Sequence, residues 1–213
     1  QSVKLNLPAP NQLPQSYSMR LLLEKITRKT ARVAVVGVGY VGTALAQAAV
    51  NAGFATVGID IDPTRVKKIN SAKQAHLTAT SDFGVIKSCD VIAVCVPTPL
   101  NRKNAPDLSL LTAAVRQAAV HLTKDQLVTI ESSLAPGTTR HLVLPIIQKS
   151  GSKVGQDIYL AHSPERIDPG NTSYPMRRIP KVVGGVNAVS ERMALAFYGE
   201  LVDTIVPVSS LEA

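Results

Sequence analysis

Apolar residues in this chain fall into short β-branched runs separated by longer segments with helical spacing. The first run, Val33–Val36, is typical of a buried strand, and the alanine-rich segment Val41–Val50 has the composition of a helix. Gly53 lies where a helix C-cap is expected, and Ala55–Ile59 predicts a second strand. Together these segments predict one strand–helix–strand unit.

The alternation continues along the chain. Asp62 is expected to cap a helix that has Pro63 at its first position, and Asp107 is expected to cap a later one. The apolar stripe of that later helix comprises Leu111, Val115, Ala118, Ala119 and Leu122. Further strands are predicted near His76–Ala79 and at Val91–Val96, Leu127–Ile130, Ile158–Ala161, Lys181–Val183 and Val202–Val206, and further helices over Thr138–Lys149, interrupted at Pro145, and over Ala188–Tyr198. This pattern predicts an α/β fold with a doubly wound, mostly parallel sheet of the Rossmann type.

Composition and charge exclude several other classes of protein. Val33–Ile59 carries no charge, but five glycines, Gln47 and Asn51 divide it, so it does not predict a membrane span. The net charge is +8, and half of it comes from residues 1–30, where three prolines within residues 1–18 predict a disordered or tag-like tail. Only 4% of residues are aromatic and no nucleic-acid motif accompanies the charge, so we expect no nucleic-acid partner and no membrane association. The two cysteines, Cys89 and Cys95, are interpreted as reduced, structural thiols of a cytoplasmic protein.

A glycine-rich turn follows the first predicted strand. Gly37, Gly39 and Gly42 fit the pattern G-x-G-x-x-G, with Tyr40 and Val41 between the last two, and a predicted helix follows. In this context the first glycine makes a tight turn, the second lets the backbone approach a pyrophosphate, and the third lets helix and strand pack closely. The turn therefore predicts a dinucleotide site.

Asp60 ends the second predicted strand, at the spacing expected for the acid that binds the adenosine ribose. A 2′-phosphate at this position would meet a like charge, so NAD is favoured over NADP. Arg65 speaks against this preference for NAD, because a nearby arginine can accommodate a 2′-phosphate. The same arginine can equally lie against the adenine or bond the ribose.

Four segments resemble the nucleotide-sugar 6-dehydrogenases, the UDP-glucose/GDP-mannose dehydrogenase group. They are the glycine turn together with Gly58–Asp62, the stretch Val96–Leu100 with Pro106–Ser109, the stretch Glu131–Thr139, and the stretch Ser163–Asn171 with Ile179–Gly185. The sequence Ser163-Pro164-Glu165-Arg166 is similar to the branch that oxidises UDP-N-acetylhexosamines, whereas the UDP-glucose branch usually has Asn-Pro-Glu-Phe there. The resemblance implies oxidation of a sugar C6 alcohol to a carboxylate with two NAD, in the synthesis of surface polysaccharides.

The resemblance also implies roles for individual residues. Glu165 corresponds to the active-site glutamate, and Ser133 falls where the family usually has a water-positioning Thr, without the methyl group that fixes its rotamer. Arg166, with Glu165, would contact the nucleotide sugar. Val96, Thr98 and Ser132 would line the cofactor beside the residues named above. No metal is implied.

The family's nucleophilic cysteine and its central helix have no counterpart in this sequence. We therefore expect residues 19–208 to form the NAD-binding domain and residues 209–213 to begin the linker to that helix. The resemblance implies a homo-oligomeric full-length enzyme, with dimerisation through the central helix, and hence a monomeric and inactive fragment.

Alternative interpretations remain at this point. The enzyme could belong to the UDP-glucose or GDP-mannose branch, or the chain could be a non-catalytic NAD-sensing domain, although such a domain has no use for Ser133 and Glu165. His162 beside Glu165 resembles a catalytic pair but is more simply a pocket-lining histidine, and Glu131 more simply orients the loop that follows it.

Overall fold

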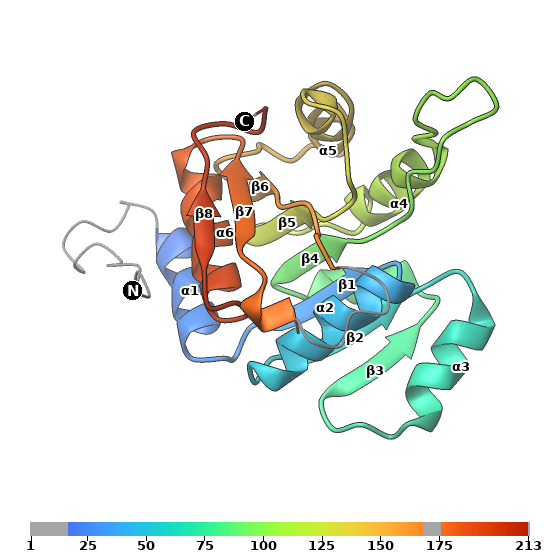
Figure 1. Cartoon of the computed structure of the whole chain (residues 1–213). Coiled ribbons are helices and arrows are strands. Elements are labelled where there is room, and N and C mark those ends of the chain that lie inside the picture. Colours follow the sequence, from blue (N-terminus) through green and yellow to red (C-terminus); the bar gives the residue numbers. More distant parts are fainter. Residues whose placement is uncertain (1–16, 168–175, 213) are drawn as a thin grey trace.

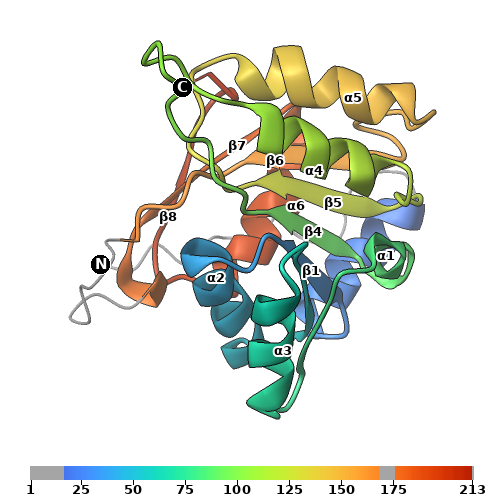
Figure 2. The same ribbon diagram turned by 90° about the vertical axis from the view of Figure 1, so that its right-hand side faces the viewer.

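A computed structural model describes residues 17–167 and 176–212 of the chain. Residues 1–16 of the predicted tail, and Asp168–Asn171 of the fourth family-like segment, lie outside the described residues. The described chain forms one eight-stranded sheet in the order β3-β2-β1-β4-β5-β6-β7-β8, with helices on both faces (Figures 1 and 2). The predicted doubly wound α/β fold is therefore confirmed.

The first half of the sheet is built from the glycine turn and the elements around it. Its three parallel strands are β1 (Arg32–Val36), β2 (Ala55–Ile59) and β3 (Leu77–Thr80), connected by helices α2 (Tyr40–Asn51) and α3 (Pro63–Ser71). Asp62 caps α3 as predicted, because its carboxylate accepts from the Thr64 N–H at 2.8 Å.

The second half continues from β1 in the opposite direction. Its strands are β4 (Val91–Val94), β5 (Gln126–Ile130) and β6 (Ile158–His162), all parallel. Its helical segments are the 3-10 helix η2 (Phe83–Ser88), α4 (Ser109–Ala119), the π-helical turn η3 (Thr139–Val143) and α5 (Leu144–Lys149). The interruption expected at Pro145 is therefore a π turn immediately before that proline, which has no N–H to donate.

The last strands change direction. β7 (Lys181–Gly185), reached through the 3-10 turn η4 (Met176–Arg178), runs antiparallel to β6. Helix α6 (Ala188–Gly199) then leads to β8 (Ile205–Pro207), which pairs with β7 in parallel. As a result, the first residue of β7 lies at the edge where β4, β5 and β6 end.

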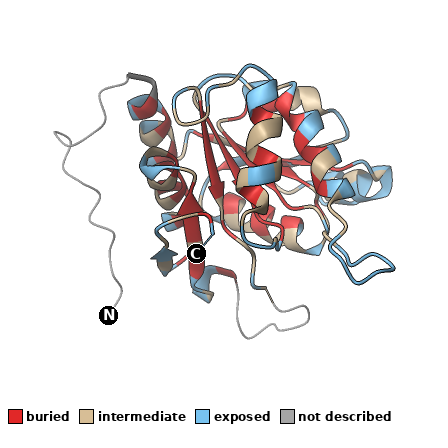
Figure 3. Ribbon diagram, turned by 90° about the horizontal axis from the view of Figure 1, so that it is seen from above, coloured by how far each residue is buried: buried red, intermediate tan, exposed pale blue. Residues whose placement is uncertain are grey.

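Two buried apolar clusters hold the layers together, one on each face of the sheet. The first joins α1, α2 and α6 to the sheet, and the second joins η2, α4 and α5 to it. Figure 3 shows the strands as a buried layer and the helices as buried on one side and exposed on the other. Among the described residues no helix is long and apolar enough to cross a membrane.

Helix α1 (Tyr17–Thr27) was not predicted, although the domain was expected to begin at residue 19. Met19, Leu22 and Ile26 lie on one side of it and are almost fully buried, and the helix packs against α6 (Figure 1). The segment before β1 is thus part of the fold and part of the first apolar cluster.

Several predicted boundaries are corrected. β4 ends at Val94, not Val96, because the chain then passes beneath the glycine turn: a Cβ on Gly37 would lie 2.8 Å from the Cys95 carbonyl oxygen. The strand expected at Val202–Val206 is only Ile205–Pro207, since Val202 is buried in the turn after α6. Helix α4 ends before Leu122. Its N-cap is Leu108 rather than Asp107, although the Asp107 carboxylate accepts from the Ser109 N–H at 2.9 Å.

Substitutions on the two sides of α1 should differ in their effect on stability. Leu22 is 1% exposed and Leu21 is 40% exposed on the same helix. We expect Leu22→Ala to lower the free energy of unfolding by about 2–5 kcal/mol and Leu21→Ala by less than about 0.5 kcal/mol. Urea unfolding of both variants measures this. Equal stability of the two would mean that α1 does not belong to the folded domain.

Candidate functional site

The glycine turn between β1 and α2 has the backbone geometry that a dinucleotide needs. Gly37 adopts a φ of +88°, which favours glycine, and its N–H donates to the Ile59 carbonyl at 2.7 Å. Gly42 lies on the inner side of α2, where a Cβ would stand 1.8 Å from the Gly37 carbonyl oxygen. The first and third glycines are therefore required by the turn itself.

Gly39 is different, because nothing among the described residues needs it to lack a side chain. A Cβ at this position would have the Arg65 guanidinium, 3.8 Å away, as its nearest neighbour. The open space lies at the N-terminal end of α2, where amide N–H groups and the helix dipole favour phosphate. It joins a groove between α2 and α3 whose lining includes Val38, Tyr40, Thr43 and Arg65. The turn thus fits the pyrophosphate of a dinucleotide, with Tyr40 and Val41 in the first turn of the helix.

Asp60 is buried directly after β2 and connects two loops. One carboxylate oxygen accepts from the Val38 N–H in the glycine turn at 2.9 Å, and the other accepts from the Asp62 N–H at 2.9 Å. These bonds fix the carboxylate beside the turn, at the place expected for the ribose acid. The Arg65 guanidinium, 3.3 Å away, uses the third of the carboxylate's four lone-pair positions, and about one is left for a ligand hydroxyl.

Arg65 is already paired with acids in this structure. Its guanidinium lies 3.3 Å from the Asp60 carboxylate and 3.5 Å from that of Asp62, and its side chain is half exposed. The positive charge that could attract a 2′-phosphate is thus balanced by two carboxylates. This arrangement favours NAD, although the assignment of Asp60 and Arg65 to the cofactor stays a prediction.

The loops after β4 and β5 are bonded to each other. The Ser132 hydroxyl donates to the Val96 carbonyl at 2.6 Å, and the Thr98 hydroxyl donates to the Ser133 carbonyl at 2.9 Å. Ser132 is buried, whereas the Ser133 side chain is exposed. Both loops therefore lie at the carboxyl edge, where the Ser132 hydroxyl holds them together, and the ligand role of the exposed Ser133 stays a prediction.

Glu165 belongs to a buried group of charges at the same edge. The Lys181 ammonium donates to the Glu131 carboxylate at 2.7 Å and to the Glu165 carboxylate at 2.9 Å. The three side chains are 4%, 0% and 5% exposed, respectively. The Tyr198 hydroxyl donates to the second Glu131 oxygen in a short hydrogen bond. The position of Glu165 is thus defined by Glu131, directly after β5, and by residues of β7 and α6.

Burial and pairing act in opposite directions on these groups. Burial favours the neutral amine of Lys181, but the carboxylates of Glu131 and Glu165 outweigh it and raise the Lys181 pKa above its usual value. Burial raises the pKa of Glu131, opposed by Lys181 and by the Tyr198 hydroxyl. Burial also raises the pKa of Tyr198 well above its usual value. Lys181 is therefore a cation and Tyr198 a neutral hydrogen-bond donor.

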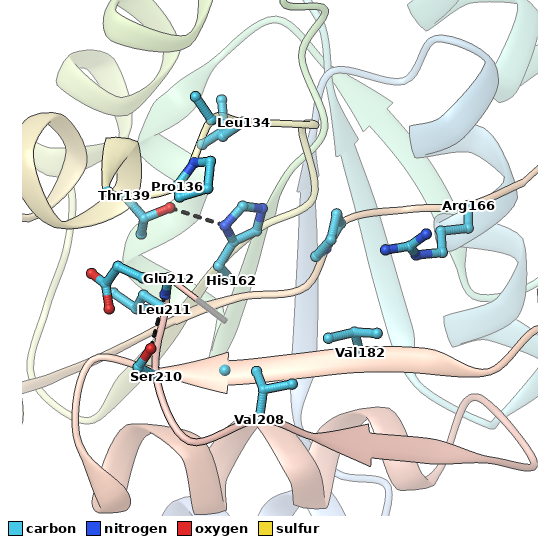
Figure 4. Close-up of a pocket in the computed structure, with 14 residues that line it drawn as sticks. Leu134, Pro136, Thr139, His162, Arg166, Val182, Val208, Ser210, Leu211 and Glu212 are labelled. Atoms are coloured by element: carbon cyan, nitrogen blue, oxygen red, sulfur yellow. Dashed lines mark hydrogen bonds between the residues drawn. The ribbon is translucent and has the colours of Figure 1, made fainter.

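His162 lines a pocket between the loop after β5 and the segment after β8 (Figure 4). Its Nε2 lies 3.2 Å from the Ser132 carbonyl and its Nδ1 lies 3.2 Å from the Thr139 hydroxyl. Because a carbonyl can only accept, Nε2 carries the proton and Nδ1 accepts from Thr139. Burial lowers the His162 pKa. The histidine connects the loop after β5 to η3 as a neutral ring, in agreement with the pocket-lining interpretation.

The same region contains Arg166 and the segment 209–212, both named in the sequence analysis. The exposed Arg166 also lines this pocket, on the side opposite the His162–Thr139 pair (Figure 4). Residues 209–212, expected to be linker, pack on the domain: Leu211 is buried, and the Arg140 guanidinium pairs with Glu212 at 2.6 Å.

Neither cysteine can serve as a nucleophile in this structure. Both are free and buried. Burial raises the pKa of Cys89 to about 11 and that of Cys95 well above its usual value, so neither is a thiolate near neutral pH. Their structural interpretation is confirmed.

Sequence reasoning located the glycine turn, Asp60 and Glu165 but missed Lys181 and Tyr198. Lys181 had one available signal, because a lysine opening the buried apolar strand Lys181–Gly185 needs a partner. Tyr198 had none, since a tyrosine on the apolar side of a helix is ordinary core.

Comparison with known proteins gives one family. The model of the UDP-glucose/GDP-mannose dehydrogenase family, NAD binding domain, matches residues 31–202. The UDP-N-acetyl-D-mannosamine dehydrogenase of Pyrococcus horikoshii is 33% identical over 189 residues, which cover 80% of this chain and 45% of that protein. The UDP-N-acetyl-D-glucosamine 6-dehydrogenase of Salmonella typhi is 30% identical over 187 residues, covering 80% and 43%.

A solved structure agrees with these matches. The structure of the Pyrococcus horikoshii UDP-D-ManNAc dehydrogenase superimposes with a TM-score of 0.79 at 31% identity, covering 84% of this chain and 47% of that one. This chain thus spans less than half the length of the relatives it matches.

The second glycine offers a test of the dinucleotide site that leaves the fold unchanged. Gly39 has φ −71° and room for a Cβ, so Gly39→Ala should shift the melting temperature by less than about 2 °C. The added methyl group occupies the space next to the helix N-terminus, and we expect NAD to bind at least about tenfold more weakly, as for the loss of one charged hydrogen bond. Calorimetric titration with NAD measures this.

Gly199→Ala, at the end of α6, is the matched control, because the nearest described neighbour of its Cβ would be Ile205 at 3.6 Å. It should leave both quantities unchanged. Unaltered NAD affinity in Gly39→Ala would remove the glycine turn from the cofactor site.

Proposed function

The chain belongs to the UDP-glucose/GDP-mannose dehydrogenase family, and from this premise we propose that it forms the NAD-binding part of a UDP-N-acetylhexosamine 6-dehydrogenase. Such an enzyme oxidises the C6 alcohol of the sugar to a carboxylate with two NAD. One observation carries the proposal: a dinucleotide turn backed by Asp60 shares one sheet edge with a carboxylate, Glu165, held in a defined position.

The choice of sugar rests on two supports. Ser163-Pro164-Glu165-Arg166 has the form of the N-acetylhexosamine branch, and the relatives named above act, by their names, on the gluco and manno forms of such sugars. Arg166 is exposed beside Glu165 and can pair with a diphosphate or a sugar hydroxyl. We therefore propose a UDP-N-acetylhexosamine as the substrate, with UDP-glucose and GDP-mannose as the alternatives.

Different residues along the carboxyl edge of the sheet bind different parts of the cofactor. Gly37, Gly39 and Gly42, with Tyr40 and Val41, bind the pyrophosphate, and Asp60 orients the adenosine ribose with Arg65 beside it. Val96, Thr98 and Ser132 line the cofactor from the loops after β4 and β5. A bound NAD would supply the acceptor for the hydride that leaves C6.

Glu165 and Ser133 act at the reacting end. The Glu165 carboxylate can take a proton from an attacking water or return it, and the exposed Ser133 hydroxyl can position that water. The thiol nucleophile of the family chemistry must come from elsewhere in the complete protein, because Cys89 and Cys95 are buried. We propose that the complete protein works in surface-polysaccharide synthesis, as a homo-oligomer in the cytoplasm, where buried reduced thiols persist.

The complete protein that carries this domain provides the test. Incubated with NAD and UDP-N-acetylglucosamine or UDP-N-acetylmannosamine, it should form two NADH per sugar, while UDP-glucose and GDP-mannose react more slowly. Glu165→Gln should lower kcat by about a hundredfold or more without changing NAD affinity. Glu24→Gln, at a half-exposed surface pair with Arg28, is the matched control and should have no effect.

The alternatives give different results in the same assay. Faster oxidation of UDP-glucose or GDP-mannose would move the enzyme to another branch of the family. Binding of NAD with no NADH formed from any nucleotide sugar would contradict the proposal and favour a sensing domain. The chain by itself should bind NAD and form no NADH.

A further inference from the structure

Lys181 reaches the proposed active site because one strand runs against the others. The antiparallel pair β6–β7 aligns Ala161 with Gly185 and His162 with Gly184. Continuing this register past the end of β6 brings Lys181 opposite Glu165. A lysine at the start of a parallel strand would lie at the other end of the sheet, so the reversal of β7 puts a cation behind the carboxylate.

The contacts of Lys181 use all three of its protons. They point to Glu131 at 2.7 Å, to Glu165 at 2.9 Å and to the Ser163 carbonyl at 3.4 Å. The ammonium also lies 5.0 Å from the centre of the Tyr198 ring. A fully satisfied ammonium in a buried position has one favourable arrangement, and it fixes the groups that it bonds.

Glu165 is held from two sides as a consequence. Its Oε2 accepts from Lys181 and its Oε1 accepts from the backbone N–H of Arg166 at 2.8 Å. Its own N–H donates to the Glu131 carbonyl at 3.1 Å. Both carboxylate oxygens are therefore oriented, although the residue lies in the loop after β6.

Glu131 and Tyr198 hold the cation in turn. Glu131 is fully buried and bonds Lys181 through one oxygen and Tyr198 through the other. Because Glu131 neutralises Lys181, the remaining negative charge of the group belongs to Glu165. At its inner end this chain of hydrogen bonds stops at the completely buried Tyr198, so it provides no path from Glu165 to solvent through Tyr198. This arrangement is suited to positioning Glu165.

We propose that Lys181 is the positioning residue for Glu165, and that Glu131 and Tyr198 form the buried support that holds Lys181 in place. The catalytic use of Glu165 rests on the function proposed above, whereas the positioning itself can be measured without turnover. Without Lys181, the Glu165 side chain should leave its place and become accessible.

Carbodiimide-driven amidation of carboxylates, read out by peptide mass spectrometry, tests this on the chain as it is. In the unaltered protein Glu165 should be amidated slowly compared with Glu24, whose side chain is 50% exposed. Lys181→Met should raise the Glu165 rate at least about tenfold relative to Glu24, the factor expected when one charged hydrogen bond no longer opposes opening. Lys181→Arg keeps the charge and should restore most of the protection.

A second variant keeps the test valid if Lys181→Met does not fold. The double substitution Glu131→Gln with Lys181→Met removes both members of the inner ion pair and leaves Glu165 as the remaining charge, and it should expose Glu165 to the same extent. Lys25→Met is the matched control: it breaks the 2.7 Å pair with Asp90, which precedes β4 at the opposite end of the sheet. That variant should leave Glu165 protected. NAD affinity should be unchanged in every variant, since none touches the glycine turn.

The outcomes separate the two proposals. The positioning role is overturned if the amidation rate of Glu165 is unchanged both in Lys181→Met and in the double variant. It is also overturned if that rate rises equally in Lys25→Met. A Glu165 that reacts as fast as Glu24 in the unaltered protein also overturns it. Failure of the proposed enzyme function would instead appear as missing NADH formation by the complete protein, with the protection of Glu165 intact.

Discussion

The carboxylate of Asp60 is the contact on which the cofactor half of the molecule depends. It is buried at the end of β2 and bonds the N–H of Val38 in the turn after β1, so two neighbouring loops share one acceptor. A buried carboxylate is stable only when its oxygens are bonded, and the backbone of both loops must therefore keep this arrangement. The same bonds leave the acid beside the open space at Gly39. The side chain that we propose for ligand recognition thus also holds the fold together.

At the other half of this sheet edge, the acid Glu165 lies in a loop and must be held in place there. Parallel strands supply only their carboxyl ends to this edge. The reversal of β7 adds its first residue, Lys181, and α6 adds Tyr198. A buried ion pair contributes little to stability compared with apolar packing, so its value here is in orientation, with Glu165 as the group oriented.

The sequence predicted the local parts of this design well. The strands β1, β2 and β5 and the helices α2 and α6 are within two residues of their expected bounds, because periodicity and the glycine turn are local signals. Helix α1 was missed even though Met19, Leu22 and Ile26 have helical spacing, since prolines and charge around it suggested a tail.

The contacts made between distant segments could not be predicted in this way. An apolar run such as Lys181–Gly185 looks the same whether it pairs in parallel or antiparallel, so nothing local places Lys181 opposite Glu165. The pairing of Arg65 with Asp60 and Asp62 likewise depends on side-chain directions that spacing does not give. The candidate site was therefore located from sequence, while its electrostatic support was not.

Calorimetric titration of this chain with NAD and, separately, with NADP tests the central claim most directly. The carboxylate of Asp60, with Arg65 already paired to it, should admit the free ribose hydroxyls of NAD and reject a 2′-phosphate. We predict binding of NAD and no measurable binding of NADP under the same conditions. Preference for NADP, or binding of neither dinucleotide, would contradict the account of this edge.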